Sequence, residues 1–144
     1  MQVMEVNTLG PFLGAKACLP YFSKAGQGRI VNMASTSPLK GVPGMTHYVS
    51  SKGAVIALTR CLARELGAQG ITVNAVAPGL TLSDGILANT EHVNEFRGLS
   101  KNARALKRDA VPDDLVGTVS FLMSQDAGFM TGQTLVVDGG ATFV

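Results

Sequence analysis

The apolar positions along the chain fall into blocks whose spacing alternates between helix and strand. Residues 3–22 carry almost no charge and place apolar side chains at helical intervals, which predicts a helix buried on more than one side. After a turn at 24–28, the short β-branched run at 29–34 is typical of a buried parallel strand. Helical spacing returns over 46–67. The first half of the chain therefore predicts a helix, a strand and a second helix.

The second half repeats this alternation, with a polar interval after its first strand. The apolar run 71–77 predicts another buried strand, and the polar stretch that follows predicts a helix near 91–106 that moves relative to the rest. The run Pro112–Asp114 starts a further helix, which extends to Leu122, because proline and acidic residues suit a helix N-terminus. A third strand is predicted at 134–137.

Strands that alternate with helices of this length predict βαβ units, a parallel sheet and right-handed crossovers. The 144 residues correspond to a single domain. However, the chain opens directly in an apolar helix, and a parallel sheet of three strands would leave a long apolar edge open to solvent. We therefore expect this chain to be part of a larger fold.

Composition excludes several classes of protein. The chain has 46% hydrophobic and 15% charged residues, which excludes intrinsic disorder, and a net charge of +2 gives no reason to expect nucleic acid as a partner. The apolar stretch Val6–Leu19 contains Gly10 and Pro11 and is shorter than the about 20 residues that span a membrane, and no signal peptide is recognisable. Cys18 and Cys61 make no disulfide framework and are predicted to be buried small hydrophobes, so a cytoplasmic location is expected.

The pair Tyr48 and Lys52 is the first candidate for chemistry. The two side chains are four residues apart and share a helix face, and a nearby positive charge lowers the pKa of a phenol. A tyrosine tuned in this way can exchange a proton with an alcohol or carbonyl oxygen. Surface packing alone would also account for such a pair. The functional interpretation is favoured by Ser35, thirteen residues before Tyr48, and by Pro78–Gly79 after the next strand.

Four segments together resemble the C-terminal part of a short-chain dehydrogenase/reductase, in the order this family has. They are GRIVNMAS at Gly28–Ser35, the pair Tyr48 and Lys52, NAVAPG at Asn74–Gly79 and the segment Gly132–Gly140. The resemblance covers nearly the whole chain and is weakest over 84–111. It points to the subgroup that includes oxoacyl-carrier-protein reductases and many sugar, steroid and small-alcohol dehydrogenases.

The resemblance implies an α/β fold, a Rossmann-like doubly wound parallel sheet of which this chain holds the last three strands and their flanking helices. Residues 1–144 would then be the C-terminal, catalytic and nicotinamide-side part of a single domain. The glycine-rich turn that receives the pyrophosphate is missing from this chain, as is the residue that selects NAD or NADP. The cofactor is therefore expected to be NAD or NADP, without a choice between them.

The resemblance also implies roles for individual residues. Tyr48 would be the acid/base, Lys52 would hold the nicotinamide ribose and lower the tyrosine pKa, and Ser35 would stabilise the substrate oxygen. Asn7 would support a proton relay with Lys52. Independently of the family, Pro11 lacks the N–H that would bond the Asn7 carbonyl, so the helix is predicted to bend there and leave that carbonyl free for a water.

On the cofactor side, the resemblance implies that Pro78 and Gly79 line the nicotinamide. Thr81 stands where the family commonly has a β-branched aliphatic residue, and Ser83 stands where it has a threonine. Both carry a hydroxyl that could contact the nicotinamide. Together with Tyr48 and Lys52, these four residues are the predicted cofactor-binding set.

Other polar residues favour plainer interpretations. His47 is interpreted as a polar residue at a loop or helix start, and His92 has no partner at metal-ligand spacing, so no metal site is predicted. A run of cations could face an anionic substrate over a lid, but a solvated helix face is the favoured interpretation. The run comprises Arg97, Lys101, Arg104, Lys107 and Arg108.

The functional hypothesis is an NAD(P)-dependent oxidoreductase that interconverts a small-molecule alcohol and ketone by hydride transfer. No nucleic acid or membrane is expected as a partner. The family resemblance implies a homodimer or homotetramer, with the helices at 3–22 and 46–67 as possible subunit contacts. The alternative is a truncated, non-catalytic fragment that acts as an oligomerisation or interaction module through those same helices.

Overall fold

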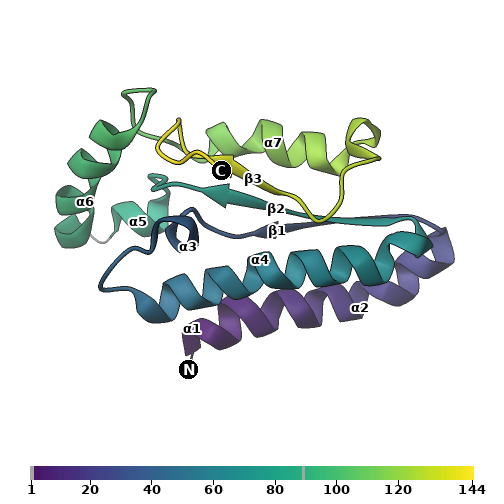
Figure 1. Ribbon diagram of the computed structural model, residues 1–144. Coiled ribbons are helices and arrows are strands. Elements are labelled where there is room, and N and C mark those ends of the chain that lie inside the picture. The colour runs from purple at the N-terminus through teal and green to yellow at the C-terminus, as the bar shows by residue number, and fades with distance from the viewer. Residues whose placement is uncertain (1, 89) are drawn as a thin grey trace.

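The three predicted strands form one parallel sheet. The computed structural model of the chain describes residues 2–88 and 90–144 (Figure 1). The strands are β1 (Gly28–Met33), β2 (Ile71–Pro78) and β3 (Thr134–Val137), in the order β1-β2-β3. Both pairs are parallel. The predicted α/β fold class is confirmed, and the strand bounds differ from the predicted ones by one residue at most.

The helices follow the predicted blocks and are broken into shorter pieces at several points. The predicted helix at 91–106 ends three residues early, because Arg104 begins a turn. The helical elements are α1 (Gln2–Met4), η1 (Glu5–Leu9), α2 (Gly10–Ala25), α3 (Ser37–Lys40), α4 (Thr46–Leu66), η2 (Gly67–Gln69), α5 (Asp84–Leu87), α6 (Thr90–Ala103), α7 (Asp113–Met123) and η3 (Gln125–Ala127). In the part of the chain that is described, no helix is both long and apolar enough to cross a membrane.

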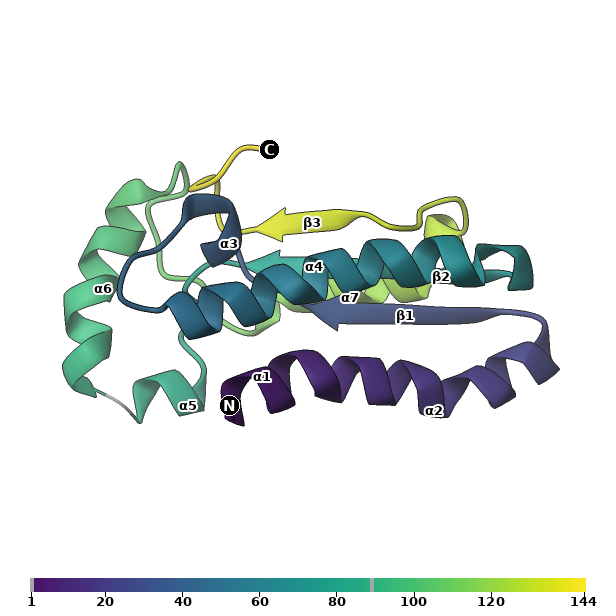
Figure 2. The same cartoon turned by 60° about the horizontal axis from the view of Figure 1, so that its bottom comes forward.

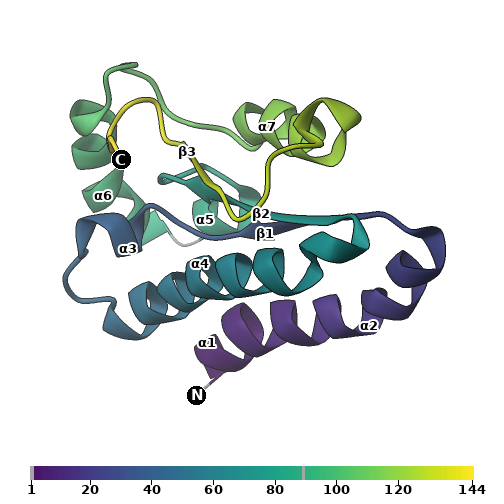
Figure 3. The ribbon, with the colours of Figure 1, turned by 45° about the vertical axis from the view of Figure 1, so that its right-hand side comes forward.

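Helices cover both faces of the sheet. Helices α2 and α4 lie on one face and α7 lies on the other (Figures 1 and 3). The central strand β2 is buried along the seven residues 71–77, as expected for a parallel strand covered on both faces. On the α4 side, Val55 packs with Ala75 and Ala77, and on the α7 side, Leu122 packs with Val76.

The two crossovers have opposite hands, which corrects the prediction that both are right-handed. The connection from β1 through α4 to β2 is right-handed (Figure 2). The chain then steps from β2 to β3 in the same direction but crosses by α7 on the other face, which makes that connection left-handed. A right-handed crossover is the rule for parallel strands, because a right-twisted strand and its helix pack back onto the sheet in that hand. The long connection with α5 and α6 has enough length to pass to the opposite face.

The N-terminal helix is less buried than its composition predicts. Only Ala15 of α2 is buried, whereas Val6 is 66% and Leu13 is 50% exposed. The prediction of burial on more than one side is therefore wrong for this chain, because α2 presents one stripe to α4 and the sheet and no described element covers the opposite side. Cys18 and Cys61 are also exposed, which corrects the prediction that they are buried.

The helical irregularity predicted near Pro11 takes the form of a widened turn. Residues Glu5–Leu9 form a π-helical segment between α1 and α2, and the Gly10 N–H donates to the Glu5 carbonyl. Such single π turns are rare and occur frequently at functional sites. The segment includes Asn7, so the backbone there departs from regular α-helical geometry, while the free Asn7 carbonyl stays a prediction.

Candidate active site

The carboxyl ends of all three strands meet at one edge of the sheet, beside α3, α5 and α6 (Figure 2). Ligands of open parallel sheets bind outside this edge. Beyond β1, the Ala34 N–H donates to the Val76 carbonyl at 2.8 Å and the Thr36 N–H donates to the Pro78 carbonyl at 3.0 Å. These two bonds hold Ser35 beside the end of β2.

The Ser35 hydroxyl is held in place by a neighbouring serine. Ser35 is 6% exposed, and its Oγ donates to the Ser37 Oγ at 3.0 Å and accepts the Ser37 N–H at 3.1 Å. This short turn, which leads into α3, restricts the Ser35 side chain to one orientation. Ser37 thus acts as the partner of Ser35 in this structure.

Tyr48 and Lys52 lie half-buried in the first turns of α4. The Lys52 Nζ donates to the Met33 carbonyl, the last residue of β1, at 2.8 Å. Partial burial disfavours the charged ammonium and lowers the pKa of Lys52 from its ordinary value. Helix α4 is thereby tied to the edge of the sheet that carries Ser35.

Ser51 is a site residue that the sequence analysis missed. Its side chain is fully buried, and its Oγ donates to the Tyr48 carbonyl at 2.7 Å and accepts from Asn7 Nδ2 at 3.0 Å. The Thr8 Oγ1 donates to the Ser51 carbonyl at 3.2 Å. Ser51 therefore joins the π-helical segment to the turn of α4 that carries Tyr48. Its signal in the sequence was a polar residue on the apolar stripe that continues with Val55.

Replacing Ser51 by alanine should lower the free energy of unfolding by about 1–3 kcal/mol, because the part-buried Asn7 amide would lose its acceptor. Chemical denaturation of Ser51→Ala and of Ser50→Ala would measure the difference. Ser50 is the adjacent, exposed serine on the same helix and serves as the matched control. Equal stability of the two variants would contradict the structural role of Ser51.

The loop after β2 leaves no room for a side chain at its start. The Gly79 N–H donates to the Val137 carbonyl at 3.2 Å, and a Cβ on Gly79 would lie 2.8 Å from the Asp138 Cβ. The Thr81 Oγ1 donates to the Gly79 carbonyl at 3.1 Å. Ser83 precedes α5, and its hydroxyl does not cap that helix. No hydrogen bond among the described residues joins Thr81 or Ser83 to Tyr48 or Lys52.

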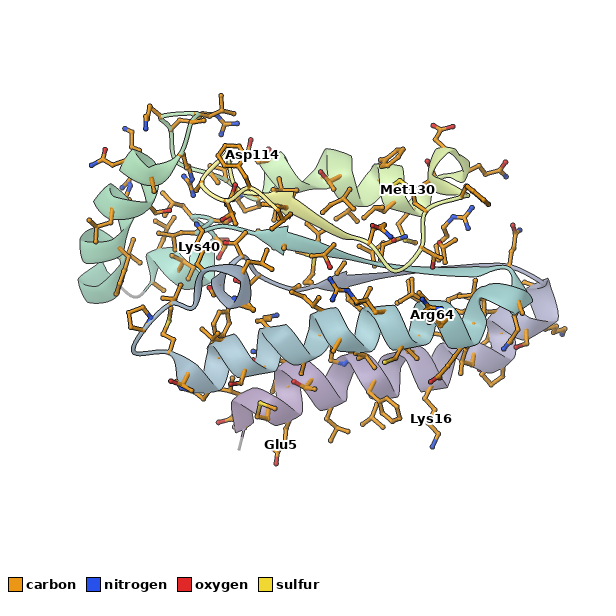
Figure 4. All side chains as sticks on the ribbon, viewed as in Figure 1. Glu5, Lys16, Lys40, Arg64, Asp114 and Met130 are labelled. Atoms are coloured by element: carbon orange, nitrogen blue, oxygen red, sulfur yellow. The ribbon has the colours of Figure 1, made fainter. Side chains whose placement is uncertain are left out.

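Asp138, which the sequence analysis treated only as the end of a strand, orders the loop after β3. It is 3% exposed, and its Oδ1 accepts the N–H groups of Gly140 and Ala141 at 3.1 and 3.0 Å. The Lys40 Nζ, at the end of α3, lies 3.7 Å from the Asp138 Oδ2 (Figure 4). The segments that follow β1 and β3 are therefore in direct contact.

The run of cations behaves as a solvated face with one exception. Lys101 and Lys107 are exposed. Arg97 forms an ion pair with Asp109, with 2.6 Å between the Arg97 Nη2 and the Asp109 Oδ2. Arg104, however, is 3% exposed, which corrects the prediction for that residue. A helical pattern places it with its neighbours on the surface, but α6 ends at Ala103 and the turn that follows points the Arg104 side chain inward.

Arg108 forms the second surface ion pair of this segment, with Asp114 at the start of α7 (Figure 4). The Arg108 Nη2 lies 2.5 Å from the Asp114 Oδ1, and this guanidinium holds the pKa of that carboxyl well below its usual value. His47 is exposed at the start of α4, as predicted. The side chain of His92 lies outside the described part of the structure.

A cavity of about 610 Å³ lies away from these residues, between α4 and the segment before β3. Arg60, Arg64 and Gln133 line it, and none of the predicted site residues does. The Arg64 side chain extends from the far half of α4, whereas Glu5 and Lys16 point away from the sheet (Figure 4). The predicted site is therefore an open edge of the sheet in this chain.

Comparisons with known proteins cover almost the whole chain. The model of the family described as enoyl-(acyl carrier protein) reductase matches residues 1–142. Nodulation protein G of Azospirillum brasilense is 37% identical over 141 residues, which are 98% of this chain and 56% of that protein. The 2-(S)-hydroxypropyl-CoM dehydrogenase 3 of Xanthobacter autotrophicus is 36% identical over 146 residues, which are 99% of this chain and 57% of that protein.

A solved structure of 4-hydroxyisoleucine dehydrogenase complexed with NADH and succinate superposes with a TM-score of 0.85 at 33% identity. The superposition covers 96% of this chain and 57% of that one. The chain thus spans a little more than half the length of the relatives that it matches.

Proposed function

The chain belongs to the short-chain dehydrogenase/reductase family, and on this premise we propose that its protein transfers a hydride between NAD or NADP and an alcohol/ketone pair. Tyr48 is the acid/base in this proposal, and Ser35, Lys52 and Asn7 assist it. The name of the Xanthobacter relative and the NADH bound to 4-hydroxyisoleucine dehydrogenase support the reaction class. We take the substrate to be a small-molecule alcohol or carbonyl compound.

One observation carries the proposal. The bond from the Lys52 Nζ to the Met33 carbonyl brings the Tyr-x-x-x-Lys turn of α4 to the carboxyl end of β1, two residues before Ser35. The Lys52 ammonium and the fixed Ser35 hydroxyl thereby lie at the edge where parallel sheets bind nucleotides, and Tyr48 stands one helical turn before Lys52. If Tyr48 and Lys52 were only solvent-exposed residues of α4, Lys52 would not need to contact the end of β1 near Ser35.

The residues present fit a nicotinamide cofactor. An ammonium has three N–H donors, and the Met33 carbonyl accepts only one from Lys52, which leaves two for the vicinal hydroxyls of a ribose. Pro78, Gly79, Thr81 and Ser83 would line the nicotinamide side. When bound, the nicotinamide supplies or accepts the hydride.

The chain's own residues move the proton. Tyr48 would give its phenolic proton to the carbonyl oxygen during reduction and take it back during oxidation. The Ser35 Oγ is held by the Ser37 N–H, and its one O–H would turn from the Ser37 Oγ to the same substrate oxygen and stabilise the charge that develops there. Since the pKa of Lys52 is lowered, its ammonium releases a proton more readily than an exposed lysine, which suits it to a relay with Asn7 and water.

We also propose that the protein is a homodimer or homotetramer of the cytoplasm. The exposed apolar side chains of the N-terminal helices, among them Val6, Leu9 and Leu13, support burial of this surface by another element. A non-catalytic interaction module would use the same surface. The enzyme is favoured because such a module would not need the held hydroxyl of Ser35 or the anchored Lys52.

The test uses the protein as its gene encodes it. Titration with NADH and NADPH, followed by nicotinamide fluorescence, should show saturable binding of one or both. The absorbance of the reduced nicotinamide at 340 nm should then rise or fall when members of a panel of secondary alcohols and ketones are added. Absence of binding for both nucleotides would refute the proposed function.

A further inference from the structure

A buried arginine lies between the loops that follow β2 and β3. Arg104 is 3% exposed, and no described carboxylate lies within ion-pair distance of it. A buried cation costs several kcal/mol unless hydrogen bonds compensate it. The Arg104 guanidinium donates from Nη2 to the Leu80 carbonyl at 2.5 Å and from Nη1 to the Arg108 carbonyl at 2.7 Å. These two bonds supply the compensation at the terminal nitrogens, whereas the buried Arg104 Nε has no hydrogen-bond partner among the described residues.

The first of those acceptors belongs to the loop that was predicted to line the nicotinamide. Leu80 stands between Gly79 and Thr81, and the Leu82 N–H donates to the Ala110 carbonyl at 2.8 Å. Thr81 pairs with Ala110 in an isolated parallel bridge. The segment 104–110 thus holds this loop at two successive points, one of them through the side chain of Arg104.

The stem of Arg104 is held from the other side by the loop after β3. A Cβ on Gly139 would lie 3.2 Å from the Arg104 Cδ, closer than ordinary contact, and the φ of +71° at Gly139 favours glycine there. The N–H groups of Ala105 and Leu106 donate to the carbonyls of Gly140 and Gly139 at 3.2 and 2.9 Å. The guanidinium therefore has a fixed origin from which it reaches Leu80.

We propose that Arg104 is a positioning residue that sets the conformation of loop 79–83, and through it the nicotinamide side of the cofactor site. This inference rests on the function proposed above. Arg104 is not assigned any contact with the cofactor or substrate. It acts because a planar fork with several N–H donors can hold two carbonyls at once, whereas a lysine presents one nitrogen.

The first test measures the loop itself and needs no cofactor. Hydrogen–deuterium exchange is compared in the protein as its gene encodes it, in Arg104→Met and in the matched control Lys101→Met. Lys101 is exposed and lies in the same segment, so the control removes an equal charge. We expect faster exchange of the amides over 79–83 in Arg104→Met only, with β1 and α4 unchanged. Equal exchange in the two variants would overturn the proposal.

The second test separates the two halves of the cofactor site. NADH contains the nicotinamide, whereas ADP-ribose lacks it and retains the adenosine half. Arg104→Met should weaken NADH binding roughly tenfold, by the loss of charge-assisted hydrogen bonds, and leave ADP-ribose affinity within about twofold. Arg104→Lys should fall between the wild type and Arg104→Met for NADH.

The outcomes distinguish the two proposals. If the wild type binds neither NADH nor ADP-ribose, the proposed function fails. The hydrogen–deuterium exchange experiment still tests whether Arg104 orders loop 79–83. If Arg104→Met proves too unstable to study, Arg104→Lys takes its place in both experiments. An equal loss of NADH and ADP-ribose affinity in the Arg104 variant that is measured would show a general structural role and overturn the inference.

Discussion

Tyr48→Phe should lose nearly all turnover, by roughly 10²–10⁴-fold, while the fold and the cofactor affinity stay close to those of the wild type. The substitution removes only the phenolic hydroxyl, the proposed proton donor. That hydroxyl makes no hydrogen bond to the described residues, and the Tyr48 contact with Ser51 is made by its backbone carbonyl. No buried partner is therefore left unsatisfied, and the variant isolates the chemistry from the fold.

The measurement is kcat at saturating cofactor and substrate, together with the NADH dissociation constant and the unfolding midpoint. Tyr21→Phe is the matched control, because Tyr21 is the other tyrosine of the chain and is 75% exposed on α2. A Tyr48→Phe enzyme whose kcat stays within a few-fold of the wild type would exclude Tyr48 as the acid/base.

Lys52→Met should weaken cofactor binding and shift the pH dependence of the reaction together. In the proposed site the ammonium assists the proton transfer of Tyr48 and contacts the cofactor, so removing this charged group should change the shape of the pH profile of kcat/KM for alcohol oxidation. The same variant should bind NADH more weakly, because the proposed ribose contact is removed.

Two variants serve as comparisons for Lys52→Met. Lys52→Arg keeps the charge and should retain the pH profile better than the methionine variant. Lys16→Met removes one charge from the exposed side of α2 and should change neither quantity. A pH profile and an NADH dissociation constant that both stay unchanged in Lys52→Met would refute the assignment of Lys52.

The lowered pKa of Lys52 also has a consequence for stability that needs no cofactor. Burial makes the folded state bind this proton more weakly than the unfolded chain does. The contribution of Lys52 to stability is therefore lowest below its folded pKa and rises with pH until the ordinary lysine value of 10.5 is reached. Chemical denaturation at several pH values across this alkaline range should show that the free energy of unfolding rises less steeply with pH in Lys52→Met than in the wild type.

The amino-acid sequence by itself determined the elements and the spacing of the central motif. Apolar periodicity within one segment is a local property, so β3 was predicted at its observed bounds and α4 to within one residue. Tyr48 and Lys52 were placed on one face because the helical repeat alone puts positions i and i+4 together. The order of motifs was also sufficient to recognise the family.

Tertiary structure decided which other residues reach that motif. Ser51 joins Asn7 across 44 positions, and Arg104 reaches Leu80 across 24, so neither contact follows from a periodicity. The left-handed second crossover and the exposed side of α2 likewise depend on which faces the other elements cover. Periodicity and spacing are properties of the chain and can be predicted from the sequence. Burial and long-range hydrogen bonds are properties of the packed molecule, so only the tertiary structure could decide them.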